Sequence, residues 1–193
     1  MRIIFIGPPG VGKGTQSARL IEHFKIPHLS TGEMLRQATR EGTAAGLEAQ
    51  TYMASGKLVP DPLILKLIEA RLDEPDSKKG ALFDGFPRTL GQARALEKLL
   101  KNRGMPIDAV LELKADTQEL LRRLRSRKRA DDRPEIVQER LESYYSQTAP
   151  LLEYYRDRGL LVTIDATGTP EEVFARIKAT MEQRGKRSGT DQE

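Results

Sequence analysis

Several residue types are absent from this chain of 193 residues or scarce in it, and each absence excludes a class of chemistry. There is no cysteine, which excludes disulfide bonds, thiol catalysis and cysteine ligands for zinc. The two histidines, His23 and His28, are too few for a catalytic zinc site of three histidines. The longest apolar run near the start, Ile3–Ile6, is far shorter than the ~20 residues of a membrane span or the roughly 7–15 of a signal-peptide core. We therefore expect a soluble, cytoplasmic protein with no membrane partner.

Aromatic residues are also scarce, with five Phe, five Tyr and no Trp. Surfaces that bind single-stranded nucleic acid usually combine aromatic and basic side chains, so this composition argues against a nucleic-acid partner. The net charge of +4 comes from 32 Lys and Arg residues against 28 Asp and Glu residues. Such a charge favours anionic partners in general. Nucleotide phosphates, RNA and acidic proteins all fit it, so the positions of the basic residues have to distinguish them.

The length is enough for one domain, at roughly 100–200 residues per domain. We expect a single domain over residues 1–183 and a disordered tail at 184–193, which has no apolar residue. Short apolar segments alternate with helical stretches, as is typical of an α/β fold with a parallel sheet and helices on both faces. We predict five strands, at Arg2–Ile6, Ile26–Leu29, Ala81–Asp84, Ala109–Leu113 and Leu160–Ile164.

Helix starts carry recognisable capping signals. Ser30, Thr89 and Asp116 are each followed three residues later by Glu or Gln, and Pro62 and Pro170 suit the first helical position. Three helices, at about 31–41, 43–55 and 62–73, precede the third strand, more than a crossover needs. We expect the extra helices to form a flap over about 30–59 that stands off the sheet.

The strongest motif is GPPGVGKGT at Gly7–Thr15, directly after the first predicted strand and at the start of a helical stretch. Such a loop lets successive N–H groups point at a phosphate, and the helix N-terminus adds partial positive charge. Lys13 supplies a charge for the outer phosphates. The hydroxyl residue usually follows the lysine directly, but here Gly14 intervenes and Thr15 takes that role. A nucleoside triphosphate is therefore the predicted ligand, although a simple glycine-rich turn is the alternative.

A second motif, DGFPR at Asp84–Arg88, follows the third predicted strand. A carboxylate at a strand end beside the loop can orient the water shell of Mg²⁺, and Asp84 would do so together with Thr15. Asp84 could instead cap the next turn. We predict no direct protein ligand, since Mg²⁺ would be carried by nucleotide phosphates. Arg88 can bind a phosphate with two of its nitrogens.

The basic run RRLRSRKR at Arg122–Arg129 has two interpretations, an RNA-binding helix and a solvated helix face. Leucines on one side of the helix form an apolar stripe, and Arg123 and Arg127, four residues apart, share one edge. We interpret these two as active residues, and Arg122 and Arg125 as surface charges.

Taken together, the motifs resemble those of the adenylate kinase family, in the short form without the long lid insert that sometimes carries zinc. The resemblance runs from Met1 to about Met181. It rests on Gly7–Thr15, Ser30–Arg36 (STGEMLR), Gly56–Val59 (GKLV), Asp84–Arg88 with Gln92, and Arg129–Asp132 (RADD).

The resemblance implies a three-layer P-loop nucleoside monophosphate kinase fold on a five-stranded parallel sheet, with ATP, AMP and ADP as ligands. It assigns ATP to Gly10, Val11, Gly12, Lys13, Gly14, Thr15, Arg127 and Gly168. AMP is assigned to Thr31, Arg36, Lys57, Leu58, Val59, Gly85, Phe86, Pro87, Arg88, Gln92, Arg129 and Arg140. The residues implied in catalysis are Lys13, Arg88, Arg123, Arg127, Arg129 and Arg140.

Simpler interpretations of several of these residues stay open. Gln92 lies three residues after Thr89 and could be a capping partner instead of a reader of adenine. Ser30 and Glu33 are also a plain capping box. Arg36 and Lys57 could be ordinary solvated charges.

The implied reaction is Mg·ATP + AMP ⇌ 2 ADP, and we expect the enzyme to act as a monomer. Its acceptor is a phosphate oxygen that is already ionised, so no general base is required. Positioning, Mg²⁺ and arginines would supply the catalysis, and the flap with a lid at about 126–132 would exclude water. That lid is very short, because only Lys128 separates Arg127 from Arg129.

Two other functions are alternatives. A UMP/CMP kinase shares most of these motifs, but Thr31 and Gln92 favour adenine as the acceptor base. A P-loop ATPase that binds RNA through the basic run is the more remote alternative.

Overall fold

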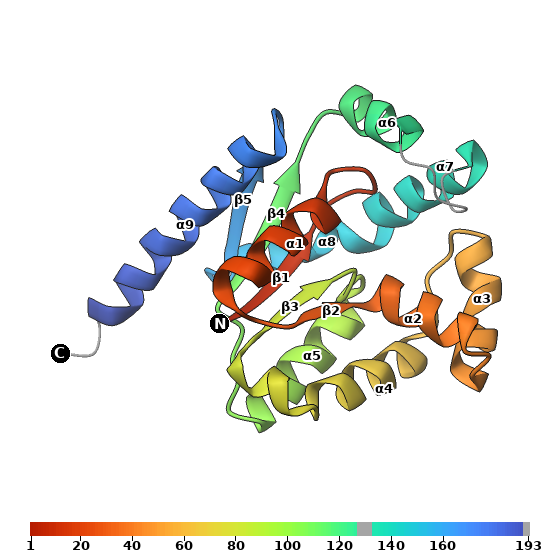
Figure 1. Ribbon diagram of the computed structural model, residues 1–193, viewed down its shortest axis with the longest axis horizontal. Helices are drawn as coiled ribbons and strands as arrows, with labels where there is room; N and C mark the ends of the chain where they lie inside the picture. The colour runs from red at the N-terminus through yellow and green to blue at the C-terminus, as the bar shows by residue number, and fades with distance from the viewer. Residues whose placement is uncertain (127–132, 191–193) are drawn as a thin grey trace.

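In the computed structural model, which describes residues 1–126 and 133–190, five strands form a single sheet (Figure 1). Their order is β2-β3-β1-β4-β5, and every pairing is parallel. This confirms the predicted α/β fold with a five-stranded parallel sheet. The strands are β1 (Arg2–Ile6), β2 (His28–Ser30), β3 (Ala81–Asp84), β4 (Ala109–Lys114) and β5 (Leu161–Asp165).

Two strands begin later than we predicted. β2 begins at His28 and not at Ile26, because Pro27 has no N–H to donate to the ladder and only its carbonyl accepts, from Leu82. β5 begins at Leu161 and not at Leu160, because the Leu160 N–H closes the end of the preceding helix on the carbonyl of Tyr155.

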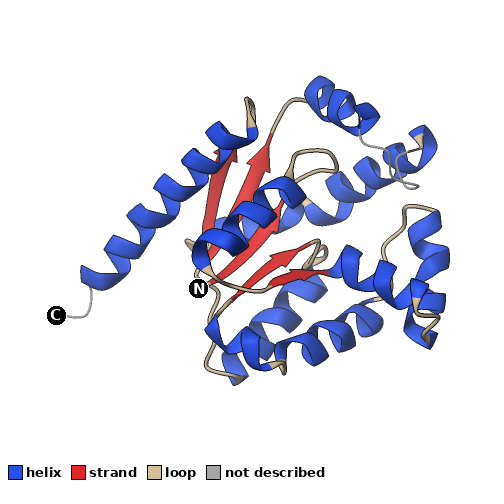
Figure 2. Ribbon diagram, viewed as in Figure 1, coloured by secondary structure: helices blue, strands red, loops and turns tan. Residues whose placement is uncertain are grey.

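Helices cover both faces of the sheet (Figure 2). The apolar run of β1 explains this, since Ile3 and Phe5 point to one face and Ile4 and Ile6 to the other, and all four are buried. The first face packs against α1 (Lys13–Phe24), α6 (Thr117–Ser126) and α9 (Pro170–Thr190). The second packs against α4 (Asp61–Leu72), α5 (Leu90–Asn102) and α8 (Pro150–Arg156).

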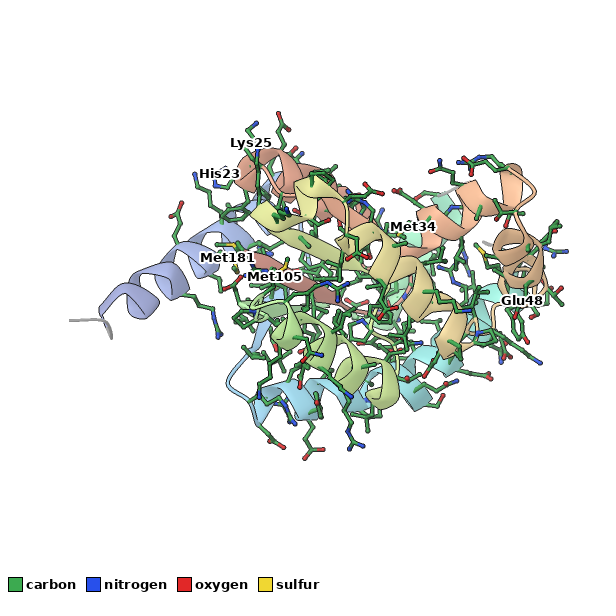
Figure 3. All side chains as sticks on the ribbon, turned by 90° about the horizontal axis from the view of Figure 1, so that it is seen from below. His23, Lys25, Met34, Glu48, Met105 and Met181 are labelled. Atoms are coloured by element: carbon green, nitrogen blue, oxygen red, sulfur yellow. The ribbon has the colours of Figure 1, made fainter. Side chains whose placement is uncertain are left out.

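Two further helices, α2 (Thr31–Arg40) and α3 (Ala44–Ala54), lie between β2 and α4, and a 3₁₀ turn at Pro75–Lys79 precedes β3. Figure 3 shows Glu48 of α3 at the opposite end of the molecule from Met181 of α9. α3 packs closely on α2, because a Cβ on Gly46 would lie only 2.1 Å from the carbonyl carbon of Ala38. The segment predicted as a flap therefore projects from the sheet beyond the carboxyl end of β2.

The segment that enters α8 changes its helical pitch. α7 (Pro134–Ser143) continues into a π-helical turn, η3 (Tyr144–Thr148), and then into α8. The N–H of Ala149 donates to the carbonyl of Tyr144, five residues earlier, at 2.8 Å.

The C-terminal segment differs from the expectation of a disordered tail at 184–193. α9 is helical through Thr190 (Figure 1), so residues 184–190 continue the helix. Extending a helix that has already formed adds one hydrogen bond per residue without the cost of a new nucleus. The Arg184 side chain also donates to the carbonyl of Gly159 at 2.7 Å.

The predicted capping residues form their bonds at two of three helices. Thr89 accepts from the Gln92 N–H at 3.1 Å, and Asp116 accepts from the Glu119 N–H at 2.8 Å. Ser30 precedes α2, but its side chain makes no capping hydrogen bond, so the box predicted there is not formed. None of the helices in the described part of the chain is sufficiently long and apolar to cross a membrane.

Candidate active site

The phosphate-binding loop connects β1 to α1 at the carboxyl edge of the sheet. Gly10 has a φ of 85°, and a Cβ there would lie 2.7 Å from Cγ of Leu124 and 2.9 Å from the carbonyl of Leu120. Only glycine fits that position, because both the backbone angle and the contact with α6 exclude a side chain. The loop therefore lies against α6, and the N-terminus of α1 is left facing a cavity.

Lys13 is held over this loop by the backbone. Its Nζ donates to the carbonyl oxygens of Gly7 at 2.5 Å and Pro8 at 3.1 Å. These bonds keep the ammonium group beside the loop, where the cavity begins.

Asp84, at the end of β3, is a buried carboxylate beside the same loop, with only 9% of its surface exposed. Its Oδ2 lies 3.3 Å from Nε2 of His28 and accepts from the Ser17 hydroxyl at 3.5 Å. Burial by itself raises the pKa of this carboxyl group. The His28 hydrogen bond and the positive charges of Lys13, His28 and Arg88 lower the pKa by more than burial raises it, so the pKa lies below its usual value. Asp84 is thus ionised at neutral pH, and its side chain bonds to neighbouring elements instead of capping the turn that follows.

Two cavities meet at this edge of the sheet. The first, of about 700 Å³, is lined by the phosphate loop and by Arg123, Gly168 and Pro170. The second, of about 910 Å³, lies under α2 and α3. Both volumes suit a nucleotide-sized ligand.

Three arginines line both cavities: Arg36 of α2, Arg88 of the turn after β3, and Arg140 of α7. They come from three separate elements, and each is partly buried. Positive charge is therefore concentrated where the two cavities join.

Most of the predicted site residues line one of these cavities. The first contains all of Gly10–Thr15 together with Gly168 and Arg123. The second contains Thr31, Lys57, Leu58, Val59, Gly85 and Gln92.

Four other predicted residues need separate comment. Phe86, predicted to contact AMP, is fully buried in the core and lines neither cavity, and Pro87 lines only the first. Arg127 and Arg129 lie outside the described residues.

Gln92 makes hydrogen bonds of more than one kind. Its Oε1 accepts from the Arg88 N–H at 2.7 Å, and its Nε2 donates to Asp61 at 2.7 Å. Its backbone N–H donates to Thr89, as the capping interpretation predicted, but the reciprocal side-chain bond goes to Arg88 instead of Thr89. The side chain also lines the second cavity, so capping does not exclude a role in reading a base.

Arg123 joins three elements. Its Nε donates to Glu119 at 2.6 Å, Nη1 to the Val11 carbonyl at 3.0 Å, and Nη2 to the Ala166 carbonyl at 2.9 Å. Its neighbour Arg122 is exposed and pairs with the same Glu119, at the rim of the first cavity. Arg123 is thus half-buried against the loop and Arg122 is exposed, while both line the first cavity.

Sequence reasoning missed several residues of the site. Gln16 is buried and donates from Nε2 to the Pro170 carbonyl at 3.0 Å. Tyr144 and Thr148 of η3 line the first cavity, and Asp61 of α4 holds Gln92. For Tyr144 and Thr148 the sequence does carry a signal: Pro150 interrupts a helical stretch just after Thr148 and indicates an irregular turn.

Comparison with known proteins identifies the family to which this site belongs. The family model described as "Adenylate kinase" matches residues 5–160. The chain belongs to the adenylate kinase family. Curated adenylate kinases align with this chain over nearly their whole length. The protein named Adenylate kinase of Mycolicibacterium paratuberculosis is 52% identical over 176 residues, 91% of this chain and 96% of the relative. Adenylate kinase 1 of Nostoc sp. is 50% identical over 180 residues, 93% and 98% of the two chains.

Membership of the adenylate kinase family makes the chain a nucleoside monophosphate kinase, a phosphotransferase that uses adenine nucleotides. It also favours adenylate kinase activity over the UMP/CMP kinase and RNA-binding ATPase alternatives.

Proposed function

We propose that the chain catalyses reversible, Mg²⁺-dependent transfer of the terminal phosphate of ATP to AMP, giving two ADP. The observation that supports this most is the pair of cavities joined at Arg36, Arg88 and Arg140. Phosphoryl transfer needs two nucleotides to meet phosphate to phosphate, with positive charge around the migrating group. One cavity is lined by the phosphate loop, and the arginines lie where it joins the other.

In this proposal, ATP occupies the first cavity and AMP the second. The loop Gly10–Thr15 and Lys13 hold the ATP phosphates, and Arg127 and the backbone at Gly168 contribute to ATP binding. The second cavity positions AMP through Arg36, Arg88 and Arg140, with Arg129 on the same phosphates. Thr31 and Gln92 select the base, Lys57, Leu58 and Val59 line it, and the turn Gly85–Pro87 supports the phosphate. Arg123 contributes by holding the loop and the Ala166 carbonyl in place.

No side chain has to act as a general base, because the attacking oxygen of AMP is already ionised near neutral pH. Catalysis then depends on holding the two phosphates in line and on the charge of Lys13 and the arginines.

The residues at the carboxyl edge of the sheet suit Mg²⁺ carried by the nucleotide. Asp84 is ionised beside Lys13, and Thr15 presents a hydroxyl at the cavity. Within residues 1–126 and 133–190, no three His, Asp or Glu side chains gather closely enough to hold a metal ion. Such a donor set fits a hard cation that takes its remaining ligands from phosphate oxygens and water. The ion would neutralise phosphate charge in the reaction.

Exclusion of water completes the proposal. We infer that the flap at 30–59 closes over the second cavity and a short lid at 126–132 over the first, within a single domain spanning 1–183. We also propose that the enzyme acts as a monomer in the cytoplasm, without nucleic-acid or membrane partners.

A coupled assay with AMP, UMP and CMP as acceptors, and with RNA added as a control, tests this function. We expect transfer to AMP to be strongly preferred and RNA to have no effect. Lys13→Ala should fold normally and lose on the order of 10²–10³ in turnover, because it removes a preorganised charge. Near-normal turnover by folded Lys13→Ala, or faster transfer to UMP, would overturn the proposal.

A further inference from the structure

The π-helical turn η3 brings two side chains into the active-site region. Pro150 has no N–H, and in a continuous α-helix its ring would collide with the carbonyl of Ser146. The wider turn, closed by the bond from Ala149 to Tyr144, avoids that clash. As a result Tyr144 and Thr148 both face inward, with only 8% and 7% of their surfaces exposed, and both line the first cavity.

The hydroxyl of Thr148 makes a specific long-range bond. Oγ1 donates to the backbone carbonyl of Arg88 at 3.0 Å, between residues sixty apart in the sequence. The N–H of Arg88 is bonded as well, to Oε1 of Gln92 at 2.7 Å. Both polar groups of the Arg88 backbone are therefore held by side chains, one from α5 and the other from η3.

The same helical segment carries another arginine of the junction. Arg140 lies on α7, which runs without interruption into η3. Arg88 and Arg140 line both cavities, so their guanidinium groups serve the same junction. The hydroxyl of Thr148 is a direct link between the segment that carries one arginine and the turn that carries the other.

We propose that Thr148 is a positioning residue for phosphoryl transfer, whose hydroxyl fixes the Arg88 turn relative to the segment that carries Arg140. The two arginines then meet the phosphate of the acceptor in one geometry. This inference rests on the proposed role of Arg88 and Arg140 in binding AMP. Thr148 acts through Arg88 and needs no contact of its own with the nucleotide.

Two substitutions separate the hydroxyl from the packing of the side chain. Thr148→Val keeps the shape and removes the hydroxyl, whereas Thr148→Ser keeps the hydroxyl and removes a methyl group. We expect Thr148→Val to lower kcat/KM for AMP by about three- to tenfold, the size of effect that one neutral hydrogen bond supports. KM for ATP should change less than about twofold, and Thr148→Ser should keep kcat/KM for AMP within about twofold of the wild type.

Thr163→Val is the matched control. The hydroxyl of Thr163, on β5, also donates a side-chain hydrogen bond, to Glu112 of β4 at 2.6 Å, and Thr163 lines neither cavity. This variant should leave kcat/KM for AMP and KM for ATP unchanged. If Thr148→Val impaired the kinetic constants for AMP and for ATP equally and also lowered the Tm, the role of Thr148 would be purely structural. That result would overturn the proposal.

Arg88→Ala separates the failure of this inference from the failure of the proposed function. If Arg88→Ala lowers kcat/KM for AMP while Thr148→Val does not, the positioning role is wrong and the acceptor site stands. If Arg88→Ala has no effect, the acceptor site itself is wrong. Adding Thr148→Val to Arg88→Ala should cost nothing further. A persistent loss in the double variant would mean that the hydroxyl contacts the nucleotide directly, which would also overturn the proposal.

Discussion

Nη1 of Arg123 donates a hydrogen bond to the carbonyl oxygen of Val11 at 3.0 Å, which joins α6 to the middle of the phosphate loop. Nη2 of the same side chain reaches the Ala166 carbonyl, just before the turn that contains Gly168. One guanidinium group thus holds together two parts of the wall of the first cavity. A planar group with several fixed donors can do this, and an ammonium group cannot.

Arg123→Lys should weaken ATP binding without affecting AMP. A lysine keeps the charge but cannot reach both carbonyls, so at least one hydrogen bond from a charged donor is lost, at about 1.5–3 kcal/mol. We expect KM for ATP to rise about tenfold or more and KM for AMP to stay within about twofold. Steady-state kinetics with each substrate varied in turn checks this. Arg125→Lys, on the exposed side of α6, is the control and should match the wild type.

Gln92→Ala should reduce the preference for AMP over UMP. The side chain lines the second cavity and is aimed by Asp61, so its loss removes a hydrogen-bonding group from the proposed base site. We expect the ratio of kcat/KM for AMP to that for UMP to fall by about five- to tenfold. Gln138→Ala, which removes an exposed glutamine of α7 bonded to Glu142, should leave the ratio unchanged. An unchanged ratio in Gln92→Ala would contradict a role in reading the base and would leave the bond to the Arg88 N–H as the role of this side chain.

Gly46→Ala should destabilise the packing of α3 on α2. The added methyl group would lie 2.1 Å from the backbone of Ala38, so the helices must move apart. We expect a loss of about 1–3 kcal/mol in the free energy of unfolding, as for other overpacked sites. Denaturant titration measures it, and Leu47→Ala at the exposed neighbouring position is the control. Equal stability of the two variants would contradict the close packing.

The contribution of Glu119 to stability should disappear at low pH. Hydrogen bonds from Arg122 and Arg123 lower the pKa of Glu119 from 4.5 to about 2. Because the folded pKa lies below the unfolded one, the stabilisation is complete above the unfolded pKa and is lost as pH falls from about 4.5 towards about 2. The difference in unfolding free energy between wild type and Glu119→Gln should therefore be constant above about pH 6 and smaller near pH ~3.5. A difference that does not vary with pH would refute this.

The sequence alone determined the elements whose signals are local. Gly7–Thr15 marks a phosphate loop because backbone N–H groups, glycines and a lysine must follow one another within a few residues. The alternation of short apolar segments with helical stretches predicted a parallel sheet covered by helices on both faces. The continuation of α9 through Thr190 has no signal in the sequence, since missing apolar residues do not stop a helix that has already formed.

The resemblance assigned Arg36, Arg88 and Arg140 to one site, and only the tertiary structure shows how these distant side chains come together. Arg36, Arg88 and Arg140 come from three elements and meet because the sheet order brings the ends of those elements to one edge. The bonds from Gln92 to Asp61 and from Thr148 to Arg88 depend on how α4, α5 and η3 pack. No residue spacing encodes such contacts. They form because separate helices bury their apolar faces on the same sheet, which brings polar side chains of different helices close enough to bond to one another.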